Sequence, residues 1–91
     1  MKYLKCLKLA LKHGDVLTLL ETNAPHKWVG VPRHIHKLNS IGIQLTNPNG
    51  VISYLEWPKA SELSYDTPLG PFNINTADGL YLKYSINGVQ A

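Results

Sequence analysis

Two of the four histidines in this chain stand two residues apart in the segment Arg33-His34-Ile35-His36-Lys37, with a cation on each side. In an extended strand, residues at this spacing point to the same face, so His34 and His36 are expected to project together. Arg33, Ile35 and Lys37 are expected to face the other way. Paired imidazoles beside cations suit three kinds of site: a metal site, an acid–base pair, or a surface that binds an anionic partner.

A zinc site is the first of these kinds. Zinc usually takes about four ligands, of which His34 and His36 would supply two. The others would have to come from distant positions in the chain: His13, His26, Cys6 or a carboxylate such as Asp66. Nothing in their spacing brings these residues to the histidine pair, so we expect neither a metal ion nor a cofactor.

Acid–base catalysis is disfavoured by the same geometry. Two histidines that cleave a phosphodiester must flank the bond, whereas neighbours on one strand face stand side by side. Cys6 falls on the apolar-leaning side of a predicted helix and is expected to be buried. The chain has no phosphate-cradling glycine loop, nucleophile elbow or clustered carboxylate pair. We therefore expect no enzyme activity, and alanine at His34, His36 or Cys6 should change activity by a few-fold at most.

The third kind of site, a binding surface, uses cations together with aromatic rings. Cations contact phosphate or carboxylate groups, and an indole stacks on a base or another planar group. Tyrosine is enriched at the centres of protein interfaces, and two tyrosines sit on strand-like segments where one face must look outward. The candidate binding residues are Lys27, Trp28, Arg33, His34, His36, Lys37, Tyr54 and Tyr81.

Composition indicates one small globular domain spanning residues 1–91. No apolar run approaches the roughly 20 residues needed to span a bilayer, and lysines interrupt the N-terminal segment where a secretory signal would need an apolar core. The single cysteine excludes an internal disulfide and a multi-cysteine zinc ribbon, which predicts a cytoplasmic protein.

Charge is divided unevenly along the chain. Residues 1–45 hold seven Lys/Arg against two acids, a balance of +5, and residues 46–91 hold two lysines against four acids, a balance of −2, which gives the total of +3. A basic half beside a mildly acidic half favours an anionic partner on one side, although a net charge of this size also serves solubility.

The elements that would position these residues follow from periodicity and turn signals. Residues 1–13 place their lysines on one helical face and their leucines on the other, which predicts a short amphipathic helix. Asn47-Pro48-Asn49-Gly50 predicts a tight turn between two strands, and Thr76-Ala77-Asp78-Gly79 predicts a second. Residues 61–65 form a further candidate strand.

Strands this closely spaced have no room for helical crossovers. The sequence therefore predicts an α+β protein that is predominantly β, with the helix packed on an antiparallel sheet or small open barrel of five to six short strands within residues 16–86. The expected core is Leu4, Leu7, Leu11, Val16, Leu17, Leu19, Ile41, Ile43, Leu45, Leu55, Trp57, Phe72, Ile74, Leu82 and Tyr84.

Two functions fit this organisation. The leading interpretation is a non-catalytic module that binds an acidic protein surface, because the cations are few and never consecutive. The alternative is a nucleic-acid or nucleotide-binding small β-barrel that uses the basic segment 27–37. A short single-domain chain without catalytic motifs is also typical of phage and mobile-element accessory proteins, including inhibitors of host defence systems. Neither interpretation involves a membrane.

Overall fold

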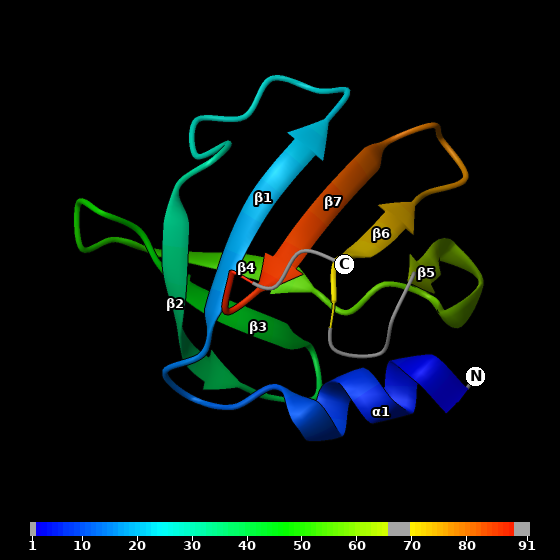
Figure 1. Cartoon of the computed structure of the whole chain (residues 1–91), viewed down its shortest axis with the longest axis horizontal. Coiled ribbons are helices and arrows are strands. Elements are labelled where there is room, and N and C mark those ends of the chain that lie inside the picture. The colour runs from blue at the N-terminus through cyan, green and yellow to red at the C-terminus, as the bar shows by residue number, and fades with distance from the viewer. Residues whose placement is uncertain (1, 66–69, 89–91) are drawn as a thin grey trace.

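One helix precedes seven strands in the structure, a computed structural model that describes residues 2–65 and 70–88 (Figure 1). The predicted class, mostly β with an N-terminal helix, is confirmed. The strands number seven rather than five to six, because the short candidate segment before the second hairpin also forms a strand. The elements are α1 (Lys2–Ala10), β1 (Val16–Thr22), β2 (Pro32–Leu38), β3 (Gly42–Thr46), β4 (Ile52–Glu56), the 3-10 turn η1 (Ala60–Glu62), β5 (Leu63–Tyr65), β6 (Phe72–Asn75) and β7 (Tyr81–Ile86).

The strands form one antiparallel sheet in the order β4-β3-β2-β1-β7-β6-β5. The first and last strands of the chain, β1 and β7, pair in the middle of this sheet, and β4 and β5 form its two edges. In Figure 1, β1 and β7 run steeply while β3 and β4 cross behind them, so the sheet curls around one face. Such curling follows from the right-handed twist of each strand.

Both predicted hairpin turns are confirmed. Gly50 donates its amide to the Asn47 carbonyl and has a φ of +84°, a left-handed conformation that glycine adopts without a steric penalty. Gly79 donates in the same way to Thr76. These turns set the β3–β4 and β6–β7 registers, which position the residues that line the concave face of the sheet.

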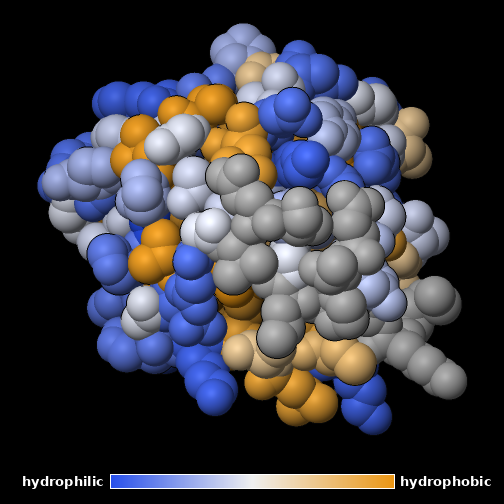
Figure 2. Space-filling view, viewed as in Figure 1, coloured by the Kyte–Doolittle hydropathy of each residue, from blue (hydrophilic) through white to orange (hydrophobic). Residues whose placement is uncertain are grey.

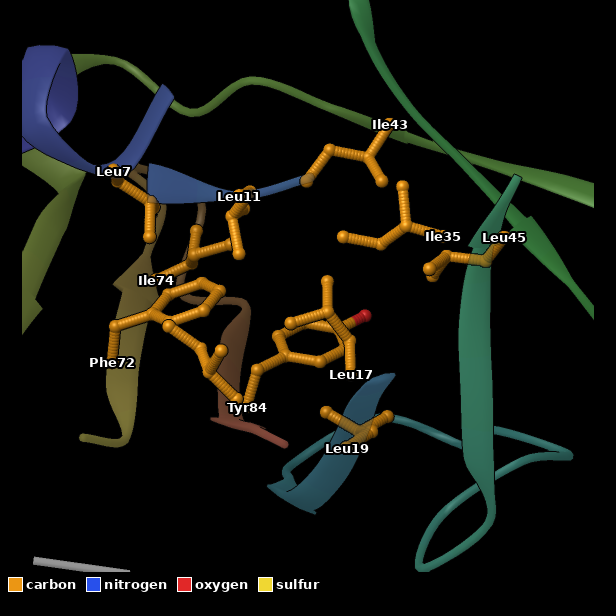
Figure 3. Packing of buried hydrophobic residues seen from close by; sticks show 11 residues of the cluster. Leu7, Leu11, Leu17, Leu19, Ile35, Ile43, Leu45, Phe72, Ile74 and Tyr84 are labelled. Carbon is orange, nitrogen blue, oxygen red and sulfur yellow. The ribbon is translucent and has the colours of Figure 1, made fainter. Parts of the chain in front are cut away.

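Apolar side chains from both halves of the curled sheet meet on its concave face (Figure 3). The rings of Phe72 and Tyr84 stack with centroids 5.7 Å apart. Leu7 and Leu11, from α1 and the residue after it, complete this cluster from one end of the sheet. Its buried members are Leu7, Leu11, Leu17, Leu19, Ile35, Ile43, Leu45, Phe72, Ile74, Tyr84 and Ile86; the expected residues Leu55, Trp57 and Leu82 are partly buried against it.

The helix is shorter than predicted. The backbone turns at Lys12, whose amide donates to the Asp15 carboxylate, and Gly14 follows with a φ of +89°. The predicted lysine face is exposed at Lys5, Lys8 and Lys12. Apolar surface is also visible at the lower edge of Figure 2, which is where α1 lies in the same view of Figure 1. Cys6 is exposed, so its predicted burial is wrong: the helix buries a narrow stripe around Leu7 and Leu11 and leaves its flanks in solvent.

Three expected core residues lie outside this core cluster: Leu4 and Val16 are half-buried, and Ile41 is exposed. Ile41 is 65% exposed, although it continues the alternation of Ile43 and Leu45. Its amide donates to the Asn39 side chain in a turn just before β3 begins. The side chain therefore stands beyond the end of the strand, where the concave face no longer covers it.

Candidate functional site

The histidine-rich segment forms most of β2, and its side chains alternate as predicted over the first four residues of the strand. Arg33 and Ile35 are buried on the concave face, whereas His34 and His36 are exposed on the outer face. The prediction for Lys37 is wrong. Ile35 pairs with Leu45 while Lys37 pairs with Gln44, so His36 is an extra residue in a β-bulge that brings Lys37 to the outer face as well.

His36 gains one neighbour from the N-terminal region. His13 Nδ1 donates to the His36 carbonyl oxygen at 2.8 Å, and the two ring centroids lie 6.5 Å apart. Asp66, another suggested ligand, lies outside the described residues. Among the residues the structure describes, no group of three or more histidines, cysteines and acids is placed to hold a metal ion.

Arg33 is the least expected feature of the segment. Its side chain is only 3% exposed, among the leucines and isoleucines of the core. Nη1 donates to Asn47 Oδ1 at 3.1 Å, and Tyr84 is a second neutral hydrogen-bonding neighbour of the guanidinium. Nε has no hydrogen-bond partner, and within residues 2–65 and 70–88 no carboxylate pairs with Arg33. The chain therefore buries a cation whose visible partners are all neutral.

A cleft of about 380 Å³ opens beside this guanidinium, between the β3–β4 hairpin and β7. Its volume falls in the range of small-molecule sites, roughly 300–1,000 Å³. The described lining includes no acidic residue, and Arg33 is its only permanently charged member. Apolar side chains dominate the rest of the wall, among them Leu45, Leu55, Leu80 and Leu82.

The loop between β1 and β2 forms the rim of this cleft. It carries two aromatic rings, those of His26 and Trp28, and the positive charge of Lys27. Trp28 and His26 line the opening, and the Lys27 ammonium lies 5.1 Å from the centre of the Trp28 ring. Trp28 donates its backbone amide to His26 Nδ1, which is the arrangement of a neutral imidazole. Partial burial, and then the positive charge of Arg33, hold the pKa of His26 below its ordinary value of 6.5.

This depressed pKa predicts a specific loss of stability in acid. Below about pH 6.5 the unfolded chain protonates His26 before the folded chain does, so stability that is present above this pH is lost as pH falls. We expect thermal unfolding midpoints of the wild-type protein to drop more between about pH 7.5 and pH 5 than those of His26→Gln. Because every other group is the same in both proteins, the difference between the two drops isolates His26; equal drops would show that His26 is not perturbed.

The remaining predicted cations and Tyr54 share the outer face of the sheet. Across the paired strands, Lys37 lies opposite Gln44, which lies opposite Tyr54; His34, Thr46 and Ile52 form the adjacent row. Neighbouring strands are about 5 Å apart, so Lys37 and Tyr54 stand about 10 Å apart on one surface. We call this surface, with His36 and the exposed Val51 at its borders, the outer β2–β4 face.

The two predicted tyrosine anchors do not come together on one surface. Tyr54 is 57% exposed, and its hydroxyl oxygen accepts hydrogen bonds from Gln44 and Asn39. Tyr81 is half-buried and donates toward Glu21 and Asn73. The eight candidate residues are thus divided among the cleft and its rim, the outer β2–β4 face, and Tyr81.

Sequence reasoning missed the residues that meet Arg33 inside the sheet. Asn47 joins the guanidinium to Ser53, whose hydroxyl accepts from Asn47 Nδ2 at 2.7 Å, and Tyr84 comes from the last strand. The alternation of β2 was the one available signal, because it assigns Arg33 to the same face as Ile35. No helix in the described ranges is long and apolar enough to cross a bilayer. No family model, curated protein or solved structure matched this chain.

Proposed function

We propose that this protein is a non-catalytic binding module that adds an extended acidic segment of a partner protein to the free edge of β4. The observation that carries the proposal is the outer β2–β4 face, where Lys37, with the imidazoles of His34 and His36 beside it, stands about two strands from the exposed Tyr54 at the sheet edge. Edge strands are common docking sites because a peptide strand can complete their hydrogen bonding.

The backbone of β4 supports this mode of binding. The Trp57 amide donates to the Ile41 carbonyl, and the Asn47 amide donates to Val51. In an antiparallel pair, the residues hydrogen-bonded to the neighbour alternate with residues whose backbone groups point outward. The backbone amides and carbonyls of Ile52, Tyr54 and Glu56 therefore point away from β3, along an edge that no other described strand covers.

Side chains on the same edge favour a protein partner. Natural edge strands usually carry lysine, proline or a bulge that discourages pairing. The β4 strand has none of these between Ile52 and Glu56, and it exposes Ile52 and Tyr54 instead. Lys37 lies beyond them on the same face, at a distance that a carboxylate of an added strand could neutralise. A single lysine, with no exposed Phe or Trp beside it among the described residues of this face, fits an acidic peptide better than a nucleic acid.

Hydrogen exchange provides the first test of this edge. In the free protein the amides of Ile52, Tyr54 and Glu56 are expected to exchange much faster than those of Ser53 and Leu55, because only the latter two point toward β3. Amide exchange measured by NMR resolves each residue. Uniform protection from Ile52 to Glu56 would mean that the edge is already occupied, and uniform fast exchange would mean that β4 is not stably paired.

The partner is tested with a photo-crosslinking residue placed at position 54, 37 or 9. Position 54 and position 37 lie on the outer β2–β4 face, whereas Leu9 is an exposed apolar control on α1. One protein should be captured from positions 54 and 37 but not from position 9, with capture resistant to nuclease. Tyr54→Ala is expected to weaken that protein's binding about 30-fold, as loss of a central aromatic typically does.

Four outcomes would contradict the proposal. Capture lost on nuclease treatment would identify nucleic acid as the partner, and capture of a second copy of this chain alone would make β4 a homodimer edge. A partner captured equally from position 9, or binding unchanged by Tyr54→Ala, would place the interaction on another surface.

A further inference from the structure

The buried guanidinium of Arg33 and the cleft beside it carry a second site. We propose that this cleft binds a small monocarboxylate, with the carboxylate against Arg33 and the apolar body of the ligand against Trp28 and the leucines of the wall. The site borders the outer β2–β4 face at Tyr54, which lines the cleft, but it does not depend on the function proposed there.

The first support is the state of Arg33. A cation removed from water is costly unless an opposite charge or full hydrogen bonding compensates for it. Here the side chain is 97% buried, Nη1 is bonded to a neutral amide, and Nε has no partner among the described residues. Nε is closed to water in this structure, so a carboxylate would meet the guanidinium at the part of it that lines the cleft and would supply the missing opposite charge there.

The second support is the chemistry of the wall. The described lining of this cleft has no acid that would repel an anion, and neutral donors stand near the cation: Ser53 lines the cleft, and the Tyr84 hydroxyl neighbours Arg33. A second cleft, of about 430 Å³, shares Tyr54, Leu55 and Leu82 with the first, but two acids, Glu56 and Glu62, border it against one lysine, Lys59. Charge therefore assigns an anion to the first cleft and not to its neighbour.

The third support concerns the charge and shape of the ligand. Arg33 is the only permanent charge in the described wall, and the surroundings of His26 favour its neutral form. The cleft can therefore neutralise a ligand with one negative charge but not a ligand with two. The leucines and the Trp28 ring offer an apolar or planar body more contact than a bare ion would use. A carboxylate with an aliphatic or aromatic body satisfies both requirements better than inorganic phosphate does.

The test is an NMR titration with benzoate and hexanoate, compared with benzamide, hexanamide and inorganic phosphate. Carboxylates are expected to shift the signals of the Arg33 Nε–H and the Trp28 indole N–H, and to bind at least tenfold more tightly than the matched amides and phosphate. Arg33→Met should abolish that tenfold preference. Lys5→Met removes the same charge from the exposed side of α1, outside the cleft lining, and should change carboxylate affinity by less than about threefold, since an exposed distant charge contributes little.

Leu82→Trp serves as an independent variant that retains Arg33 and fills the cleft, and it should also abolish carboxylate binding. Only variants whose amide spectra show a folded protein are compared with the wild type. The test therefore needs only one of Arg33→Met and Leu82→Trp to fold. The proposal is overturned if amides or phosphate bind as tightly as carboxylates, or if a folded Arg33→Met or Leu82→Trp protein keeps the preference. It is also overturned if about 10 mM of either carboxylate leaves the cleft signals unmoved, because this concentration would detect a Kd of about 1 mM. Chemical-shift changes confined to Lys37 and Ile52, which lie on the outer β2–β4 face and not in the cleft lining, would assign the carboxylate to that face instead.

Discussion

Replacing Phe72 with alanine is expected to lower the free energy of unfolding by about 4 kcal/mol. Phe72 is 1% exposed and stacks on Tyr84, at the junction where β6 and β7 meet the leucines of β1 (Figure 3). The variant loses the transfer free energy of the ring and leaves a cavity that a curled sheet cannot close. A domain of this length has about 5–14 kcal/mol of stability in total, so the loss is a large share of it.

Urea unfolding measures this loss, which should appear as a lower midpoint with an unchanged slope. Phe72→Leu is the matched control, because it keeps most of the volume and should cost only about 1 kcal/mol. An alanine variant within about 1 kcal/mol of the wild type would show that the ring is not packed as described.

Gly42→Ala is expected to destabilise the protein by about 3 kcal/mol, although it adds a single methyl group. A Cβ atom at this position would meet backbone atoms of the neighbouring strand: the Leu55 carbonyl oxygen and carbon, and Glu56 Cα at 2.8 Å. Backbone atoms cannot turn aside as a side chain can, so β3 and β4 must separate. Because this pair carries Tyr54, binding at the β4 edge should weaken as well.

The control for this substitution is Gly50→Ala in the adjoining turn. A Cβ there meets nothing within 4 Å, and the only cost is the left-handed backbone, about 1 kcal/mol. Chemical denaturation of both variants separates crowding from backbone strain. If Gly42→Ala costs no more than Gly50→Ala, the close approach of β3 and β4 is wrong.

Local chemistry determined several features directly from the sequence. The turn Asn47–Gly50 follows from the conformational preferences of proline, asparagine and glycine, and the shared face of His34 and His36 follows from the two-residue period of a strand. The mostly antiparallel class follows from strands too closely spaced for crossovers. Each of these depends on residues within about one element of each other, so no distant contact could overturn it.

Other features were decided only when distant segments met. The sequence does not show that β1 pairs with β7, which are separated by most of the chain, and this pairing places Tyr84 beside Arg33. The bulge that turns Lys37 outward arises from the pairing of β2 with β3, and Cys6 is exposed because the core accepts only a narrow stripe of α1. The concave face is created by the curl of the whole sheet. Arg33 therefore belongs to a buried cleft rather than to a basic surface, because the curl, and not its neighbours in sequence, determines which side of β2 is closed to water.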